Sequence, residues 1–420
     1  MNVVRRSAAV LAATAVIGAA TPAVAASPSP SVAIPDGLYG TADPKYDGVW
    51  RQSLALLAQD TVGVKPAAKA VDWLLGQQCA NGAYAAFRPD AAKACDAKVM
   101  VDTNSTAAAV QALVALGGHD TETGKAVGWL KSVQNEDGGW GYSPGGASDA
   151  NSTSVVIGAL TAVGEQPAQV VKGGKGDEGG KSPYDALLTF ALPCDGGGAG
   201  AFAFQPDKKG TLAANADATA AAVVGALGKG LAGDAVKPAG TAVTCKGADD
   251  REQAARNGAA YLVTALAKDK HLTSTLPGAK PQPDYGNTAD AVLALATAGQ
   301  GDKAADAMRW LEGNSRAWAK QGGPAAYAQL ILAAHAESAD VRDFGGQDLV
   351  SLLNATGPKP ASVPASAPAP AEHSGQADHK DDSDNSSDSG VSVWWIVGVG
   401  LVGGIGVGFL LSGRNKRRQP

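Results

Sequence analysis

The chain has 420 residues, of which 18% are charged and 5% aromatic, and its formal net charge is −5 at pH 7. This mildly negative balance, without a basic patch in the body of the chain, argues against a nucleic-acid partner. No two of the four cysteines have Cys-x-x-Cys spacing, so the sequence predicts no metal site.

The first residues have the pattern of an export signal. Arg5 and Arg6 precede an apolar stretch over 8–20, which is too short to cross a bilayer, and Ala23-Val24-Ala25 is a small-residue cleavage site. We therefore expect residues 1–25 to be a signal peptide and the mature protein to be secreted.

The C-terminal end has the pattern of a membrane anchor. Residues 357–390 are first Pro/Ala-rich and then Asp/Ser-rich, which predicts a disordered stalk. Residues 391–411 carry no charge and begin near Trp394, and the basic segment 412–420 follows directly. This pattern predicts one transmembrane helix at the cell membrane, with the body extracellular and the basic C-terminus cytoplasmic.

The cysteines are predicted to form disulfides, because an even number in an exported chain favours pairing. Cys79 and Cys95 are close in sequence and form the natural local pair. Cys194 and Cys245 remain, but the predicted helix between them would place them about 24 Å apart at 1.5 Å per residue. That second bridge requires a long loop that returns along the wall of the fold.

An internal repeat determines the predicted fold. Lys69-Ala70-Val71-Asp72-Trp73-Leu74 aligns with Lys125-Ala126-Val127-Gly128-Trp129-Leu130, and each segment continues to a glutamine and then to Gly-x-aromatic. We assign a structural role to the repeated positions, which are Trp73, Gln78, Gly82 and Tyr84 in one copy and Trp129, Gln134, Gly138 and Trp140 in the other.

A second pattern alternates with the first and predicts capped, buried helices. Asp102, Asp149, Asn215 and Asp284 each precede an alanine-rich apolar run and can accept from first-turn amides. Inner helices are expected near 46–61, 104–116, 151–163, 216–231, 287–298 and 324–337, and amphipathic outer helices near 66–78, 122–134, 183–192, 251–267, 302–313 and 346–355. The fold class is therefore all-α, an (α/α)6 barrel or toroid over residues 30–356, without strands.

The repeat resembles that of the terpenoid-cyclase and protein-prenyltransferase toroid family. That family's pattern is Lys/Arg-Gly/Ala-x-x-aromatic-aliphatic-x3-Gln-x3-Gly-x-Trp, which the second copy satisfies at every position. In the family these elements brace the outer helices, so the resemblance implies the same role for them here.

The resemblance does not extend to the cyclase acid. Squalene-type cyclases, which resemble this fold, carry an Asp-x-Asp-Asp-Thr-Ala element, whereas this chain has Asn104 and Ser105 after Asp102. Asp149 is followed by the same Asn-Ser pair, and helix capping explains both segments. Aromatic residues are also scarce for stabilising a carbocation. We therefore expect no terpene cyclase chemistry.

The predicted function is capture of a small molecule at the mouth where the inner helices begin. Two alternatives remain: an enzyme that acts on an isoprenoid or a glycan through Asp102 and Asp149, or a purely structural surface protein. Secreted cobalamin carriers resemble this toroid, which implies a corrinoid as a candidate ligand and a partner that supplies a β-domain or a membrane transporter. In that resemblance His271 is a candidate cobalt ligand, although its place in a loop favours a solvated histidine without a ligand role. No cofactor is otherwise expected. The candidate ligand-binding residues are Asp102, Asn104, Asp149, Asn151, Asp217, His271, Tyr285 and Asn287.

Overall fold

The computed structural model describes residues 33–174, 179–237, 244–248, 250–274 and 280–364. The predicted signal peptide (1–25), the transmembrane segment (391–411), the basic tail (412–420) and the stalk from residue 365 onward lie outside these ranges. Among the described residues, no helix is both long enough and apolar enough to cross a membrane.

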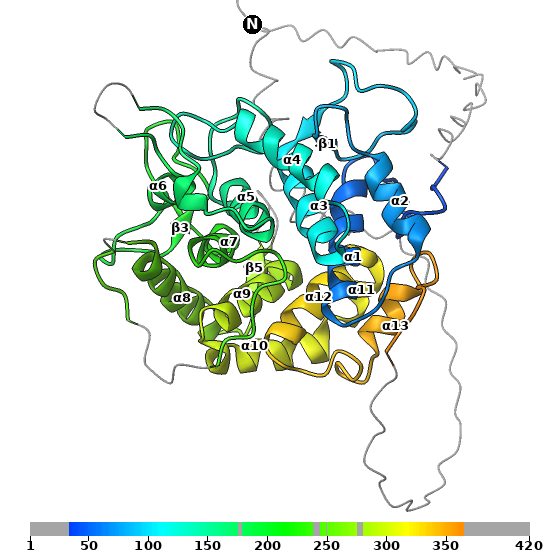
Figure 1. Ribbon diagram of the computed structural model, residues 1–420. Helices are drawn as coiled ribbons and strands as arrows, with labels where there is room; N and C mark the ends of the chain where they lie inside the picture. Colours follow the sequence, from blue (N-terminus) through cyan, green and yellow to red (C-terminus); the bar gives the residue numbers. More distant parts are fainter. Residues whose placement is uncertain (1–32, 175–178, 238–243, 249, 275–279, 365–420) are drawn as a thin grey trace, which may run out of the picture. The chain divides into compact units, whose positions relative to one another are not determined.

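Six helices form a closed inner ring in the described part of the chain. Each contacts the next in the series, and the last packs against the first, as can be followed in Figure 1. The ring consists of α1 (Gly48–Thr61), α3 (Thr103–Leu116), α5 (Ala150–Ala162), α7 (Ala216–Ala226), α9 (Tyr285–Thr297) and α12 (Pro324–Ala336).

The helices between these members pack on the outside of the ring. Each contacts the inner helix before or after it in the chain. They are α2 (Ala68–Gly76), α4 (Asp120–Ser132), α6 (Pro183–Leu188), α8 (Arg251–Ala267), α10 (Gly301–Asn314) and α13 (Leu349–Asn354). The all-helical class is confirmed, and the helices lie near their predicted places, except that α6 and α7 end at Leu188 and Ala226 and not at residues 192 and 231. One short helix, α11 (Arg316–Gly322), replaces part of a predicted loop.

Side-chain caps start four of the inner helices as predicted. The carboxylates of Asp102 and Asp149 accept from the amides of Ser105 and Ser152, at 2.6 and 2.7 Å. Asn215 and Asp284 cap α7 and α9 in the same way. The caps satisfy first-turn amides that would otherwise be unpaired in a buried place.

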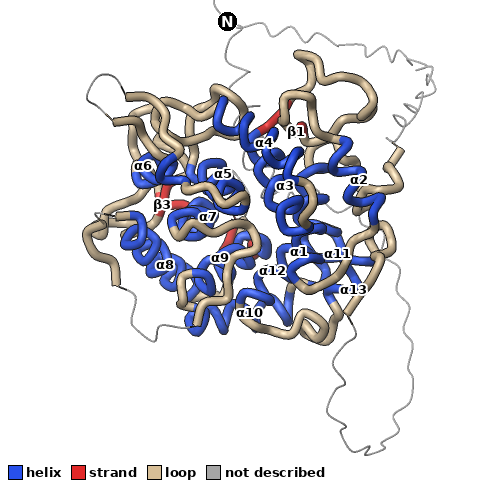
Figure 2. Tube along the Cα trace, in the orientation of Figure 1, coloured by secondary structure: helices blue, strands red, loops and turns tan. Residues whose placement is uncertain are grey.

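Short strands occur in the loops that lead into three inner helices, which corrects the expectation of none. Each strand has two or three residues and pairs with the residues directly before the next helix (Figure 2). The pairs are β1 (Tyr84–Ala85) with β2 (Val101–Asp102), β3 (Phe202–Ala203) with β4 (Ala214–Asn215), and β5 (Leu272–Ser274) with β6 (Gln282–Asp284). They arise because each loop turns back on itself before the cap residue.

The repeat residues connect neighbouring elements. The Gln134 side-chain amide donates to the carbonyls of Gly138 and Val170, and Gln78 makes the corresponding bonds to Gly82 and Glu122. The Trp140 indole donates to the Leu130 carbonyl at 2.8 Å. A third copy that the sequence comparison missed has Gly200 and Phe202 at these places. The backbone amides of Tyr84, Trp140 and Phe202 bond to inner-helix hydroxyls of Thr106, Thr153 and Thr219.

Helix α7 is shorter than predicted, and residues beside Cys245 lie against α8. It ends at Ala226 instead of residue 231, where glycines including Gly228 (φ +67°) do not favour a helix. The chain then returns along α8, where Asn257 bonds to the backbone of Lys246. Both predicted disulfides are present, Cys79–Cys95 and Cys194–Cys245, with Cα atoms 5.6 and 5.5 Å apart.

The body extends beyond the predicted start of the stalk at residue 357. Gly357 packs against the ring of Tyr39, whose hydroxyl donates to the Pro358 carbonyl at 3.4 Å. Ser362 pairs with Lys65 in an isolated bridge. The segment 357–362 is therefore bound to the helical body.

We predict that the repeat glycine is required for packing and not only for its backbone angle. Gly138 (φ +87°) and Gly145 (φ +74°) both have left-handed backbones, but only at Gly138 would a Cβ lie 2.3 Å from a carbonyl, that of Ser182. Gly145→Ala should cost about 1 kcal/mol of unfolding free energy, and Gly138→Ala about 2 kcal/mol more. Urea unfolding followed by circular dichroism measures both, and equal losses would contradict the packing role.

Candidate functional site

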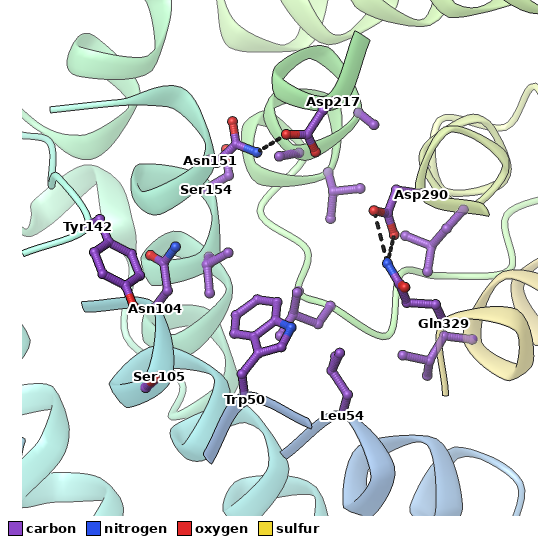
Figure 3. Close-up of a pocket in the computed structure, with 18 of the residues that line it drawn as sticks. Trp50, Leu54, Asn104, Ser105, Tyr142, Asn151, Ser154, Asp217, Asp290 and Gln329 are labelled. Carbon is purple, nitrogen blue, oxygen red and sulfur yellow. Dashed lines mark hydrogen bonds between the residues drawn. The ribbon is translucent and has the colours of Figure 1, made fainter. Parts of the chain in front are cut away.

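A cavity of about 220 Å³ lies at the centre of the inner ring (Figure 3). All six inner helices contribute to its wall, through residues such as Leu54, Ser105, Val155, Val224, Leu293 and Leu332. Several lining residues lie at or near helix starts, and one of them, Tyr46, is 66% exposed. The cavity therefore opens at the end where the inner helices begin.

The capping residue determines which side chains face the cavity. Asn104, Asn151 and Asp217 each lie two positions after a cap, on three consecutive inner helices. Asp290 lies six positions after the Asp284 cap, and Gln329 lies six positions after Gly323, which precedes α12 without a side-chain cap, so both are one turn deeper on the last two inner helices. Because positions separated by four share one face of a helix, the two sets form successive polar layers around the axis.

The segment after α7 closes the far end of the cavity. Its Leu231 amide donates to the Gln111 side chain at 2.7 Å, and its Asp234 amide donates to Thr297 at 3.1 Å. A Cβ on Gly158 would lie 2.7 Å from the Gly230 Cα, so only glycines allow this approach. At this far end, the cavity is lined by Lys229, Gly230 and Leu231. We refer to residues 228–234 as the floor segment.

Three carboxyl groups line the cavity, and burial affects all of them. Asp217 and Asp290 are partly exposed, but their exposed surface faces the cavity. Burial raises the pKa of Asp217 to about 6, against the hydrogen bond from Asn151 and with the charge of Asp284 adding to the rise. Burial, then the charge of Asp217, raises the pKa of Asp290 well above its usual range, and the bond from Gln329 opposes the rise.

The third carboxyl belongs to a cap. Burial raises the pKa of Asp102 to about 7, although the Ser105 amide bond favours the ionised form. One carboxylate oxygen accepts that bond, and the other has no partner among the described residues. Tyr142 lies beside it, and burial with the charge of Asp102 raises the pKa of its phenol. Asp102 therefore caps a helix and keeps a second, buried oxygen without a partner among the described residues.

Further polar atoms of the wall lack a partner among the residues that the structure describes. They are the side-chain oxygens of Asn104, Asn151 and Ser154. These residues are 8%, 8% and 5% exposed, so water reaches them poorly. A buried polar atom without a hydrogen bond costs roughly 1–3 kcal/mol. These atoms have almost no accessible surface, so they lie within the wall and not at its open face.

The structure brings together half of the residues predicted for the site. Asp102, Asn104, Asn151 and Asp217 line the cavity, whereas the other four do not. Both oxygens of Asp149 accept from Ser152, and the Asn287 side chain donates to Asp284. Both side chains serve the helix cap.

His271 and Tyr285 belong to an aromatic cluster outside the cavity. Tyr285 stacks between Trp310 and Trp318, with ring centroids 5.0 and 5.6 Å apart. The His271 ring lies 4.2 Å from that of Trp310. This stacking is the reason that neither side chain faces the cavity, and it does not support His271 as a cobalt ligand.

Sequence reasoning missed several lining residues. Asp290 and Gln329 are single polar residues within apolar inner helices, and that contrast was the available signal. Counting six positions from the Asp284 cap would have found Asp290, and the same count from Gly323 before α12 would have found Gln329. Trp50 and Tyr142 gave no comparable signal, because aromatic residues at such places also fill cores.

Comparisons with known proteins show no family for this chain. No family model and no curated protein matches it. Among solved structures, ent-copalyl diphosphate synthase from Streptomyces platensis is similar with a TM-score of 0.46 and 15% identity, over 69% of this chain and 50% of that chain. A protein from Actinoplanes is similar with a TM-score of 0.31 and 16% identity, over 68% of this chain and 99% of that one. This chain thus spans half the length of the synthase, and the resemblance of its repeats to terpenoid cyclases remains a prediction.

We predict that the cavity acids make the empty protein less stable as the pH rises. In the unfolded chain the pKa of an aspartate is near 4, and the folded-state pKa values of these acids lie above it. The stability that the acids contribute is therefore fully present below pH 4. It is lost as the pH rises through about 6 for Asp217 and about 7 for Asp102. Asp290→Asn should therefore raise the melting temperature by a few degrees at pH 8 and by less at pH 5. Asp72→Asn, on an exposed outer-helix position, is the matched control. An equal effect of Asp290→Asn at both pH values would contradict this origin.

Proposed function

We propose that this chain is a binding protein that takes a small molecule into the central cavity through the end where the inner helices begin. The observation that carries the proposal is the wall of the cavity, in which apolar side chains surround a few polar groups, among them the carboxyl groups of Asp217 and Asp290. Such a mixture of apolar surface and a few oriented polar groups is typical of ligand sites.

The two disulfides support a place for this protein outside the cytoplasm, where a binding protein of this kind would act. Two disulfides are typical of an oxidising environment outside the cytoplasm. The export signal, the stalk and the anchor remain sequence predictions, and together they would hold the cavity at the outer face of a cell membrane. A binding protein in that place would deliver its ligand to a membrane partner such as a transporter.

The size of the cavity limits the ligand. Ligand pockets usually enclose about 300–1,000 Å³, whereas this cavity has about 220 Å³. A corrinoid would have to lie over the opening, with a partner supplying the rest of its site. The enclosed ligand, or the enclosed part of a larger one, is therefore small.

A second candidate function is acid catalysis on an isoprenoid. Burial raises the pKa of Asp290, and the same cavity contains the aromatic side chains Trp50, Tyr142 and Phe204. A protonated carboxyl group among aromatic rings can supply a proton to an apolar substrate, which favours this function. An anionic diphosphate would face the acids Asp217 and Asp290, so the substrate would be uncharged. Product formation that disappears in Asp290→Asn would establish this function over binding alone.

Filling the cavity tests the binding proposal. Ala221 faces the cavity from α7, and Ala221→Phe places a ring in it. We predict that thermal-shift screening of the full-length chain against amines, isoprenoids, glycans and corrinoids finds at least one compound class that stabilises it. A ligand at 100 times its Kd should add about 2.7 kcal/mol, and Ala221→Phe should abolish this effect.

Ala68→Phe introduces the same ring at an exposed position of the outer helix α2 and serves as the control. It should leave the stabilisation unchanged. Stabilisation by no class, or stabilisation that survives Ala221→Phe, would exclude the cavity as a ligand site.

A further inference from the structure

We infer that the cavity selects a small organic cation, a protonated amine with an apolar body, and that its ammonium group lies between Asp217 and Asp290. This inference rests on the proposed binding function and specifies the chemical class of the ligand. It follows from the arrangement of acceptors, charges and apolar surface in the cavity wall.

The two carboxyl groups are held in place from neighbouring helices. The Asn151 amide nitrogen donates to Asp217 at 2.9 Å, and the Gln329 amide nitrogen lies 3.3 Å from both oxygens of Asp290. Figure 3 shows both carboxyl groups directed toward the same open space. Each side-chain amide donates its N–H to the neighbouring carboxyl group. The side-chain oxygen of Asn151 has no partner among the described residues.

The unpartnered atoms of the wall are mostly acceptors. The unpartnered oxygens of Asn104 and Asn151 can only accept, whereas the Ser154 hydroxyl and a protonated Asp102 can also donate. Because these atoms have almost no accessible surface, a ligand first meets the carboxyl groups of Asp217 and Asp290, which accept N–H donors when ionised. An ammonium group supplies three donors and no acceptor.

Four of the six inner-helix starts are already occupied by capping side chains, and of the six described inner helices only α1 and α12 lack such a cap. The positive ends of inner helices would attract an anion if their first-turn amides were available. In α3, α5, α7 and α9, however, a capping side chain already accepts from such an amide. The carboxylates of the caps and of the wall oppose an anionic group in the same place.

The charged and titratable side chains around the cavity favour a cation. Asp102, Asp217 and Asp290 line it, with Asp284 acting on two of them through its charge, and the phenols Tyr46 and Tyr142 are neutral donors. Lys229 is the one basic residue among the lining residues that the structure describes, and its ammonium is 2.7 Å from the Asp234 carboxylate. That lysine therefore already has its own counter-charge.

The apolar part of the wall fits the body of such a ligand. Trp50 and Leu54 project from α1 across the open space from Asp217, as Figure 3 shows. The face of an indole ring also attracts a cation. An amine with a short apolar group would place its charge at the acids and its body against this side.

Binding of a cation should release a proton from the acids. With the cavity empty, repulsion between neighbouring acids and burial favour their protonated forms, whereas an ammonium group favours the ionised forms. Affinity should therefore rise with pH through the range in which the acids lose their protons, by up to tenfold per pH unit for one released proton. A primary amine stays protonated over that range.

The test compares three ligands of one shape in isothermal titration of the full-length chain: 2-phenylethylamine, 2-phenylethanol and 3-phenylpropanoate. At pH 8 the amine should bind about 10- to 100-fold more tightly than the alcohol, and the anion should bind most weakly. The advantage of the amine should shrink at pH 5.5. Asp217→Asn and Asp290→Asn should reduce the advantage of the amine over the alcohol, whereas Asp72→Asn should not.

The outcomes separate this inference from the binding function on which it rests. If the alcohol binds in the cavity as tightly as the amine, the cation inference is wrong and the binding function stands. The cation inference is also wrong if amine binding to the unsubstituted protein is independent of pH, a measurement that does not depend on any variant folding. If no compound of the broader panel stabilises the chain either, both are wrong.

Discussion

The capping bond at the start of four of the six inner helices is the constraint on which the site depends. The first-turn amides of a helix have no partner within it, and a cap residue with a side-chain acceptor satisfies one of them. That residue also fixes the rotation of the helix about its axis. Three residues that line the cavity lie two positions after such a cap, and three more lie six positions after one: Asn104, Asn151 and Asp217, and Val155, Ala221 and Asp290. The same short polar residues thus start the helices and orient the wall.

The sequence predicts the helices well because two independent periodic signals agree. Apolar alanine-rich runs with caps identify the inner ring, and the Lys/Trp repeats identify the outer helices. The prediction fails where local propensity yields to a tertiary contact. Helix α7 ends early because its glycines let the floor segment approach Gly158, and the strands form because the loop ends are held together beside a cap. Neither contact can be recognised from nearby residues alone.

The site was only half predictable for a related reason. Residues at caps are visible in the sequence as polar groups before an apolar run, so Asp102, Asn104, Asn151 and Asp217 were found. The same reasoning also selected Asp149 and Asn287, whose side chains bond within the cap. Whether a polar group near a cap faces the cavity or the helix depends on side-chain rotation. Asp290 could be identified only by counting positions from the cap of its helix. A lone acid in an apolar helix is costly to bury, and that cost is the reason to expect a role for it.

The floor segment makes the central cavity a blind cup and not a tunnel. Its backbone is bonded to α3 and α9 and packs closely on α5, so the described body has no through-passage along the ring axis there. A polymer could not thread through the ring, and a captured molecule would leave by the route by which it arrived. Entry and exit would therefore compete for one opening, so anything docked over that opening would govern both retention and hand-over of the cargo.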